Sequence, residues 1–225
     1  MKQFLLFTFF CVGISAFAQY DDDSAFAVIA GTNQYYANTN FLSSKSKTGF
    51  TLGIGDNFSV SDNSFIRAEF TLSRFYMDFL GRETSTSNPQ WISFSLDRIN
   101  FNALYHYNFV SLLKGDIEIG VSAGGSMGMF TDFVLEDDYR EDYLLDPYGA
   151  DPEALKIDGN RNSLSFNFFG VAGIGARYRK FELNVRYHKG LTDVYRSLPA
   201  FSEYVTPKGK DDYLTATVNF YLFSY

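Results

Sequence analysis

Serine, histidine and acidic residues supply most enzymatic nucleophiles and bases, and one stretch of this chain matches a nucleophile pattern. Residues 120–124 read Gly-Val-Ser-Ala-Gly, with Ser122 at the position of the nucleophile. That motif needs a sharp turn from a strand into a helix, which exposes the serine. Here the flanking residues continue an alternation of apolar and polar side chains, which is typical of an uninterrupted strand. We therefore expect no catalytic role for Ser122.

Charged side chains recur on the polar face of the same alternating segments. Such a face is predicted to carry Arg67, Glu69, Glu118, Arg177, Glu182, Arg186 and His188. Charges that face a dry interior are costly unless they are paired. Because arginines and glutamates both occur in this set, we expect a salt-bridged plug in preference to a path for protons or ions.

Residues 131–162 are strongly acidic, with ten acids against three basic residues. Hard cations bind clustered carboxylate oxygens, but the stretch lacks the spaced Asp-x-Asp-x-Asp-Gly order, which favours diffuse counterions over a specific metal site. Apolar and aromatic side chains stand among the acids, and aromatic residues anchor protein interfaces. They predict a partner-docking loop formed by Tyr139, Tyr143, Leu144, Leu145 and Tyr148.

The elements that must position these residues are strands. Eight segments show period-two alternation and are separated by polar stretches with turn residues. They span approximately residues 25–32, 48–58, 64–76, 92–108, 116–130, 163–178, 181–190 and 213–223. The seventh segment shows the pattern most clearly, with Phe181, Leu183, Val185 and Tyr187 set against Glu182, Asn184, Arg186 and His188.

The connections distinguish a soluble sandwich from a membrane barrel, because outer-membrane barrels alternate short periplasmic turns with longer extracellular loops. In chain order the gaps are long, short, long, short, long, short and long, at residues 33–47, 59–63, 77–91, 109–115, 131–162, 179–180 and 191–212. The sequence therefore predicts an all-β fold, an eight-stranded antiparallel up-and-down transmembrane β-barrel with long extracellular loops. Both termini would then be periplasmic.

Composition excludes several other classes of protein. The 225 residues are 46% hydrophobic and 19% aromatic, with one cysteine and a net charge of −7. This excludes disorder and a disulfide framework, and the acidic charge argues against nucleic acid as a partner. Aromatic residues also gather near segment ends, as in the girdles of outer-membrane barrels. The chain ends on alternating aromatics typical of the signal that the barrel-assembly machinery reads, Tyr221, Phe223 and Tyr225, although Phe220 and Leu222 leave the lipid-facing side of this strand open.

The N-terminus reads as a cleaved secretory signal. Lys2 precedes an apolar core, and small residues at Ala16 and Ala18 mark a cleavage site. We expect residues 1–18 to be removed and residues 19–225 to form the barrel in the outer membrane of a Gram-negative bacterium.

Several motifs together resemble the PorT-like outer-membrane β-barrel family, whose founding member belongs to the type IX protein secretion machinery. The resemblance rests on Gln19 after the cleavage site, on residues 117–129 and 169–178 with their glycines, and above all on the run Arg186-Tyr187-His188-Lys189-Gly190-Leu191-Thr192. It covers essentially the whole mature chain. It implies a barrel of this class and a link to protein secretion.

These observations together predict a non-enzymatic structural or accessory subunit of an envelope complex for secretion or assembly, acting through its extracellular loops. Its partners would be outer-membrane lipids, the assembly machinery, and other outer-membrane or periplasmic proteins, without a cofactor. One alternative is a lipid A-modifying enzyme that uses His188 as base with a serine and an acid, although no serine follows His188 two residues on. Another is a small porin.

Overall fold

The computed structural model describes residues 25–113, 116–130, 133–136, 140, 143–146, 165–195 and 208–222. The signal at residues 1–18 and the terminal Phe223 and Tyr225 therefore lie outside the described residues. Eight long strands are present, namely β1 (Ala27–Thr39), β2 (Ser44–Ser61), β3 (Ser64–Arg82), β4 (Gln90–Leu112), β5 (Ile117–Phe130), β8 (Ser165–Tyr178), β9 (Phe181–Gly190) and β10 (Gly209–Tyr221). Two short strands, β6 (Val134–Leu135) and β7 (Leu144–Leu145), lie between β5 and β8 in the sequence.

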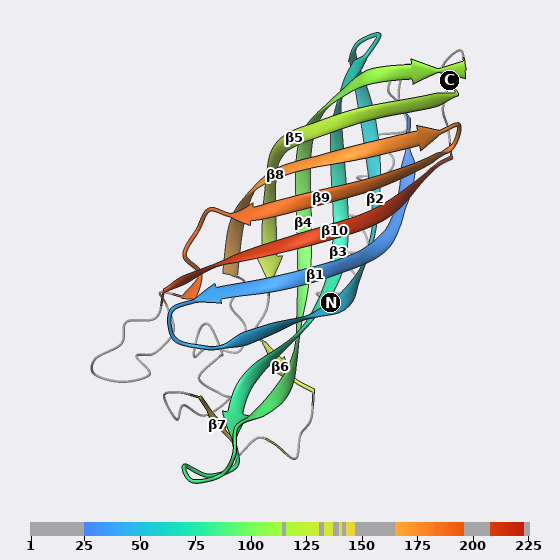
Figure 1. The fold of residues 1–225 in the computed structure, drawn as a ribbon. Helices are drawn as coiled ribbons and strands as arrows, with labels where there is room; N and C mark the ends of the chain where they lie inside the picture. The colour runs from blue at the N-terminus through green and yellow to red at the C-terminus, as the bar shows by residue number, and fades with distance from the viewer. Residues whose placement is uncertain are drawn as a thin grey trace, which may run out of the picture.

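The eight long strands form a closed antiparallel ring (Figure 1). Each strand pairs with the next along the chain, and β1 closes the ring against β10, with Ala27 opposite Tyr221. Turns at 62–63 and 179–180 lie at the same end as the start of β1 and the end of β10. The predicted eight-stranded up-and-down barrel is confirmed. Among the described residues, no helix is long and apolar enough to cross a membrane.

Within most of the ring, the burial of side chains is the reverse of that in a soluble barrel. On β9, Leu183 is 54% exposed on the outside, whereas Arg186 is 3% exposed on the inside. The predicted alternation is confirmed along the whole of this strand, where every outward residue is exposed and every inward residue is buried. A barrel with an apolar exterior and a polar interior is suited to a membrane, where lipid surrounds its outer face. The fold is therefore that of a transmembrane β-barrel.

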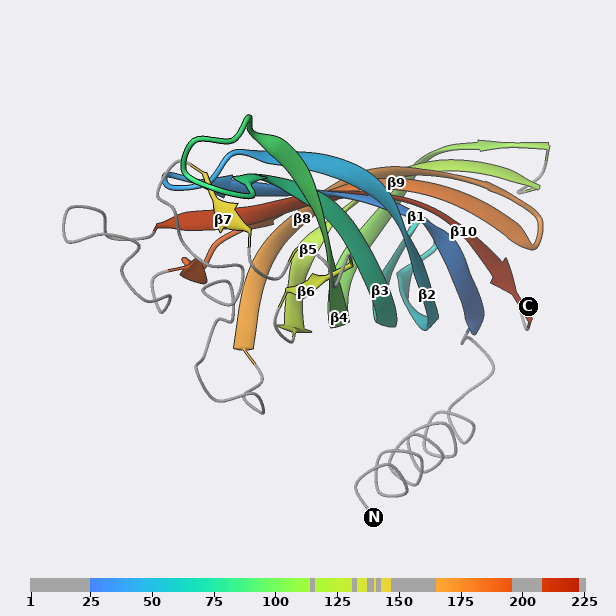
Figure 2. The ribbon, with the colours of Figure 1, turned by 90° about the horizontal axis from the view of Figure 1, so that it is seen from below.

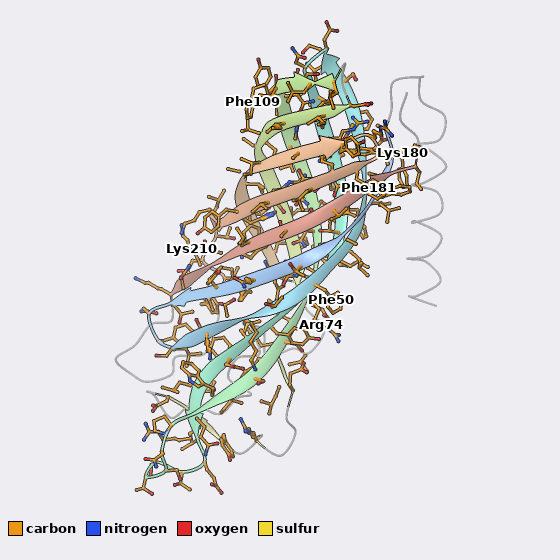
Figure 3. All side chains as sticks on the ribbon, turned by 45° about the vertical axis from the view of Figure 1, so that its right-hand side comes forward. Phe50, Arg74, Phe109, Lys180, Phe181 and Lys210 are labelled. Carbon is orange, nitrogen blue, oxygen red and sulfur yellow. The ribbon has the colours of Figure 1, made fainter. Side chains whose placement is uncertain are left out.

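The apolar exterior forms a belt of limited height. β9 is 10 residues long, in agreement with the roughly 9–11 residues that a tilted strand needs to cross a bilayer. In Figure 3, Phe109 and Phe181 lie toward the short-turn end with Lys180, and Phe50 lies beside Arg74 toward the other end. We call this surface the apolar belt. It consists of the outward apolar residues of the eight strands between the level of Phe109 and Phe181 at the short-turn end and the level of Phe50 toward the other end.

The predicted loop at residues 77–91 is wrong, because β3 and β4 continue through most of it. They form a hairpin that projects beyond the other strands (Figure 1). The prediction failed because the polarity of the two faces is exchanged here. Inward positions change from Ser73 to Phe75 and Phe79, and outward positions change from Leu72 to the exposed Arg74.

A compact apolar cluster, which we call the cap, fills the space between this hairpin and the long connections. It combines residues of the strands with residues of the β1–β2, β5–β8 and β9–β10 connections, and contains Tyr35, Phe41, Leu42, Phe75, Met77, Phe79, Ile92, Phe94, Leu96, Phe133, Leu145, Val194, Tyr195 and Tyr213 among others. β6 pairs with β4 and β7 pairs with β3, so part of the acidic connection lies along both edges of the hairpin (Figures 1 and 2).

The register of the last strand resolves which side of it faces lipid. Phe220 and Leu222 are exposed on the outside, whereas Tyr221 is 0% exposed inside the barrel. Tyr221, which the sequence placed in an aromatic assembly signal with the lipid-facing side of the strand left open, therefore faces the interior. Its hydroxyl is committed to a polar network in the interior, because the alternation of β10 turns odd-numbered residues inward.

Candidate functional site: the closed lumen and the cap

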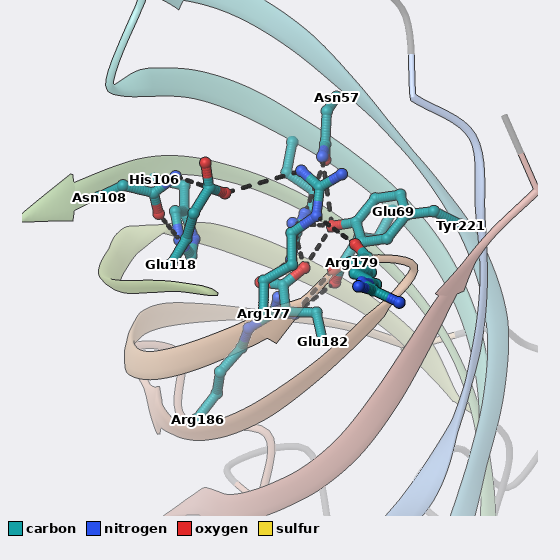
Figure 4. A network of polar contacts seen from close by, with 11 residues as sticks. Asn57, Glu69, His106, Asn108, Glu118, Arg177, Arg179, Glu182, Arg186 and Tyr221 are labelled. Carbon is teal, nitrogen blue, oxygen red and sulfur yellow. Dashed lines mark hydrogen bonds and ion pairs between the residues drawn. The ribbon is translucent and has the colours of Figure 1, made fainter. Parts of the chain in front are cut away.

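A charged layer crosses the lumen near the short-turn end (Figure 4). Arg67 of β3 donates to both carboxylate oxygens of Glu182 on β9, at 3.0 and 2.6 Å. Its Nε donates to Oδ1 of Asn57 on β2 at 2.8 Å, and the Tyr221 hydroxyl donates to Glu182. A bidentate pair of this kind is both strong and geometrically specific. Four strands are thereby joined through one arginine.

A second ion pair lies beside the first. The Nη1 of Arg186 on β9 donates to both oxygens of Glu69 on β3, at 2.8 and 2.6 Å, and Asn102 donates to the same carboxylate at 3.0 Å. The four charged side chains of the two pairs are 1–4% exposed. Removing one partner of a buried pair leaves an uncompensated charge, which typically costs about 3–5 kcal/mol.

The mouth of the lumen at the short-turn end carries a looser chain of contacts. Arg177 and Glu118 lie 3.7 Å apart and are about one quarter exposed. Asn108 joins Glu118, at 3.1 Å, to the Nε2 of His106, at 3.0 Å. The structure thus places six of the seven predicted plug residues in three ion pairs, and this mouth borders a small cavity.

The seventh predicted plug residue, His188, faces the lumen and is stacked on Tyr213 with ring centroids 4.0 Å apart. Its Nε2 lies 3.4 Å from the Thr215 hydroxyl. Among the described residues, no carboxylate and no serine hydroxyl is hydrogen-bonded to its ring. Ser122 is also buried in the lumen, in the middle of β5, as its alternation predicts. A catalytic triad therefore is not assembled around His188 in the described part of the chain.

Between the ion pairs and the cap lies a polar cavity. It is lined by Thr51, Glu69, Thr71, Ser73, Asn100, Asn102, Arg186, His188, Tyr213, Thr215 and Thr217, together with Ile29. Several buried polar atoms here have no hydrogen-bond partner on the protein, among them Oδ1 of Asn100 and of Asn102. Such groups are usually satisfied by water when the space is large enough. The middle of the lumen is thus suited to isolated waters and not to a continuous channel.

A further charged pair, which sequence reasoning missed, closes the lumen below the cap. Nη2 of Arg98 on β4 lies 3.2 Å from Oδ2 of Asp211 on β10. The guanidinium lies 5.0–5.5 Å from the ring centroids of Tyr35, Phe75, Phe169 and Tyr213. Arginine over aromatic faces gains cation–π attraction when desolvated. Asp211 was missed because it fell in the predicted gap at 191–212, although the polar run Arg98, Asn100, Asn102 signalled an inward face.

Asp211 also joins its ion pair with Arg98 to the segment that follows β9. Tyr195 donates to Oδ1 of Asp211 at 2.6 Å, and the hydroxyls of Tyr195 and Tyr35 lie 3.3 Å apart. Burial, reinforced by the negative charge of Asp211, raises the pKa of Tyr195 well above its usual value. Tyr195 therefore keeps its proton and remains a donor to the carboxylate throughout the ordinary pH range.

The predicted docking residues are not presented together to solvent. Leu145 is 0% exposed in the cap, because β7 pairs with β3 and turns this side chain inward. Tyr143 is half-buried against the cap with Arg140 5.8 Å from its ring centroid, and Leu144 is also half-buried. Tyr139 and Tyr148 lie outside the described residues. The prediction that Leu145 is a free docking contact on an extended loop is therefore wrong, because its side chain is buried in the cap.

Two other apolar side chains are exposed on the hairpin, beyond the apolar belt. Trp91 is 43% exposed on β4, and Val134 is 56% exposed on β6, which pairs with the edge of β4. Arg140 donates to the backbone oxygen of Trp91 at 2.8 Å and so ties the acidic connection to this edge. Among the described residues, no three of His, Cys, Asp and Glu form a group that could hold a metal ion.

The chain matches no model of a known protein family and no curated protein sequence. Solved structures with a similar fold include Ail, the attachment invasion locus protein of Yersinia pestis, which is 10% identical with a TM-score of 0.42 over 89% of this chain and 99% of Ail. The outer membrane protein OprG from Pseudomonas aeruginosa is 11% identical, with a TM-score of 0.45 over 90% and 97% of the two chains. The outer membrane enzyme PagL is 12% identical, with a TM-score of 0.37 over 88% and 98%. Likeness at this level carries no conclusion on function, and the barrel itself is established by its strand pairing.

Proposed function

We propose that this chain is a non-enzymatic β-barrel of the outer membrane of a Gram-negative bacterium, and that it serves as a structural or accessory subunit of an envelope complex. Membrane barrels of this design are those of outer membranes. In the proposed orientation the short turns and both termini are periplasmic, and the hairpin and cap are extracellular. The resemblance to the PorT-like family supports secretion or assembly as the process.

One observation carries the proposal, namely that the lumen is closed at successive levels. Two buried ion pairs cross it near the short-turn end, Arg98 and Asp211 cross it higher up, and the apolar cap lies above them. An eight-stranded barrel has an interior just wide enough for its own side chains. With the interior filled, functional contacts would be made by the outer surfaces, among which the hairpin projects beyond the other strands.

The exposed apolar side chains of the hairpin support docking there. Trp91 lies on β4 of the hairpin, and Val134 lies on β6 opposite Ser95 of the same strand. Tryptophan is among the residues most enriched where partners contribute most to binding. Because the hairpin lies beyond the apolar belt, these side chains face water in the free barrel, and a protein partner would cover them.

The test is purification of the natively expressed, tagged protein in a mild detergent, followed by mass spectrometry of what accompanies it. We expect stoichiometric co-purification of large envelope proteins, and its loss in the double variant Trp91→Ala with Val134→Ser. Glu83→Gln, at the exposed tip of the same hairpin, is the matched control and should retain the partners. A clean monomer from the unaltered strain would overturn the proposal.

The two alternatives make separate predictions. A small porin would conduct in planar bilayers, whereas the filled lumen leads us to expect none of the steady currents of a pore. A lipid A-modifying enzyme would change lipid A in cells that express the chain, and His188→Ala would abolish the change. The place of His188 inside the lumen, away from lipid, supports the non-enzymatic proposal.

A further inference from the structure

The lysines of the described residues are unevenly distributed over the molecule. Five of the six gather at the long-loop end, on β2, β9 and β10 and just before β10, namely Lys45, Lys47, Lys189, Lys208 and Lys210. We call these five the basic rim. The sixth, Lys180, lies in the turn between β8 and β9, and Figure 3 shows it at the opposite end of the slanting strands from Lys210.

The basic rim begins where the apolar belt ends. On β9, Lys189 is the next outward residue after Tyr187, which closes the series of exposed apolar side chains on that strand. On β10, Lys210 takes an outward position opposite Asn38 of β1. All five lysines are exposed. On β9 the basic rim therefore follows directly on the apolar belt, at the level where we expect hydrocarbon to give way to lipid headgroups.

Among the described residues, the rim carries more positive charge than its neighbouring acids, Asp78, Asp193 and Asp212, neutralise. Lys47 is paired with Asp78 at 2.6 Å, and Lys189 with Asp212 at 2.7 Å. Lys45, Lys208 and Lys210 form no ion pair with another residue that the structure describes. On β3, the strand next to β2, Arg74 is balanced by Asp97 of β4 at 2.6 Å. Among the described lysines, those without an ion pair thus lie in the sector from β9 to β2.

Two tyrosines complete the chemistry of this sector. Tyr36 on β1 and Tyr187 on β9 are exposed beneath the lysines, and the hydroxyl of Tyr187 donates to Asp212 at 2.7 Å. Amphipathic rings prefer the headgroup level of a membrane. Lysine supplies a compact charge on a flexible stem, which suits phosphate oxygens and can reach upward along an apolar surface.

We propose that the basic rim binds the phosphate groups of lipids in the outer leaflet of the membrane. The inference rests on the proposed function for the orientation of the barrel, with the long-loop end outward. Clustered lysines at a membrane surface attract anionic headgroups. The bound lipid would lie along β9, β10, β1 and β2, with its phosphates at Lys45, Lys208 and Lys210 and its chains on the apolar belt.

The probe is lipid A with two phosphates, compared with the same lipid A after removal of both phosphates. Each is titrated onto the full barrel in an uncharged detergent, and bound lipid is counted by native mass spectrometry. The variant Lys45→Gln, Lys208→Gln and Lys210→Gln together should weaken binding of the phosphorylated lipid by at least about tenfold. Lys180→Gln is the matched control and should bind as the unaltered chain does. Replacement of the same three lysines by arginine should preserve binding.

Two results would overturn this inference. One is equal binding of the phosphorylated and dephosphorylated lipids, and the other is unchanged affinity in the triple glutamine variant. Heat-modifiable migration in gels reports separately whether each variant is a folded barrel. Co-purification of envelope proteins by the triple variant tests the proposed function, so that a failure of lipid binding and a failure of partner docking are distinguished.

Discussion

The β3–β4 hairpin and the barrel below it use the same strands with opposite polarity. Below Arg74 and Asp97 the inward residues are mainly polar and the outward ones mainly apolar. Above them the inward residues are apolar and most outward ones are polar, with Leu80 and Trp91 as apolar exceptions. The exchange occurs without any irregularity in the β3–β4 register. One pair of strands thus meets lipid along one part and water along another, and we infer that the membrane surface lies near Arg74 and Asp97.

The largest effect is expected from the interior of the membrane region. Glu182→Ala leaves Arg67 buried without its carboxylate, and should lower the free energy of unfolding by about 3–5 kcal/mol. Urea titration of the barrel in lipid vesicles measures it. The double variant Arg67→Met with Glu182→Leu should recover most of the loss, because an apolar pair carries no unmatched charge. An unchanged midpoint in Glu182→Ala would show that the ion pair is not needed.

The interior of the cap should depend on packing instead. Phe79→Ala removes a ring that contacts Phe94 and Phe133 and should cost about 3 kcal/mol. Because the ring lies above the membrane, we expect faster proteolysis of the hairpin while heat-modifiable migration of the barrel is retained. Loss of the folded barrel itself would contradict a division into two separately packed interiors.

The two exteriors are compared by one substitution made in each. Leu183→Arg places a charge in the apolar belt and should lower the free energy of unfolding in vesicles by about 2–3 kcal/mol. Trp91→Arg, at an outward position of the hairpin where the side chain is 43% exposed, faces water and should cost much less. If the two variants unfold at the same urea concentration, the boundary at Arg74 and Asp97 is misplaced.

The smallest effect is expected at the boundary itself. Arg74 and Asp97 form an exposed bidentate pair, with distances of 2.7 and 2.6 Å. Exposed pairs of this kind contribute less than about 1 kcal/mol. Asp97→Asn should therefore leave the unfolding midpoint nearly unchanged, as measured by the same titration, and a shift as large as that of Glu182→Ala would point to a buried role.

The strand order, the closed ring and the two faces of β3, β5 and β9 could be predicted, because the period-two pattern is local and strong. The hairpin at 77–91 could not, since a change of solvent exchanges the faces while the local pattern persists. The partners of Arg67 depend on register across the lumen, which no local pattern encodes. Leu145 is buried only because β7 meets β3, a contact decided by the tertiary fold.

The network around Arg67 also joins segments that lie far apart in the chain. Glu182 lies 115 positions away along the chain, and Tyr221 lies 154 positions away. Contacts of such sequence separation form late, because a long loop must close first. Arg67 obtains its full set of partners only when the final strand meets the first. In a chain that stops short of Tyr221, Arg67 would lack one of its hydrogen-bond partners. The complete network is therefore present only in the full barrel.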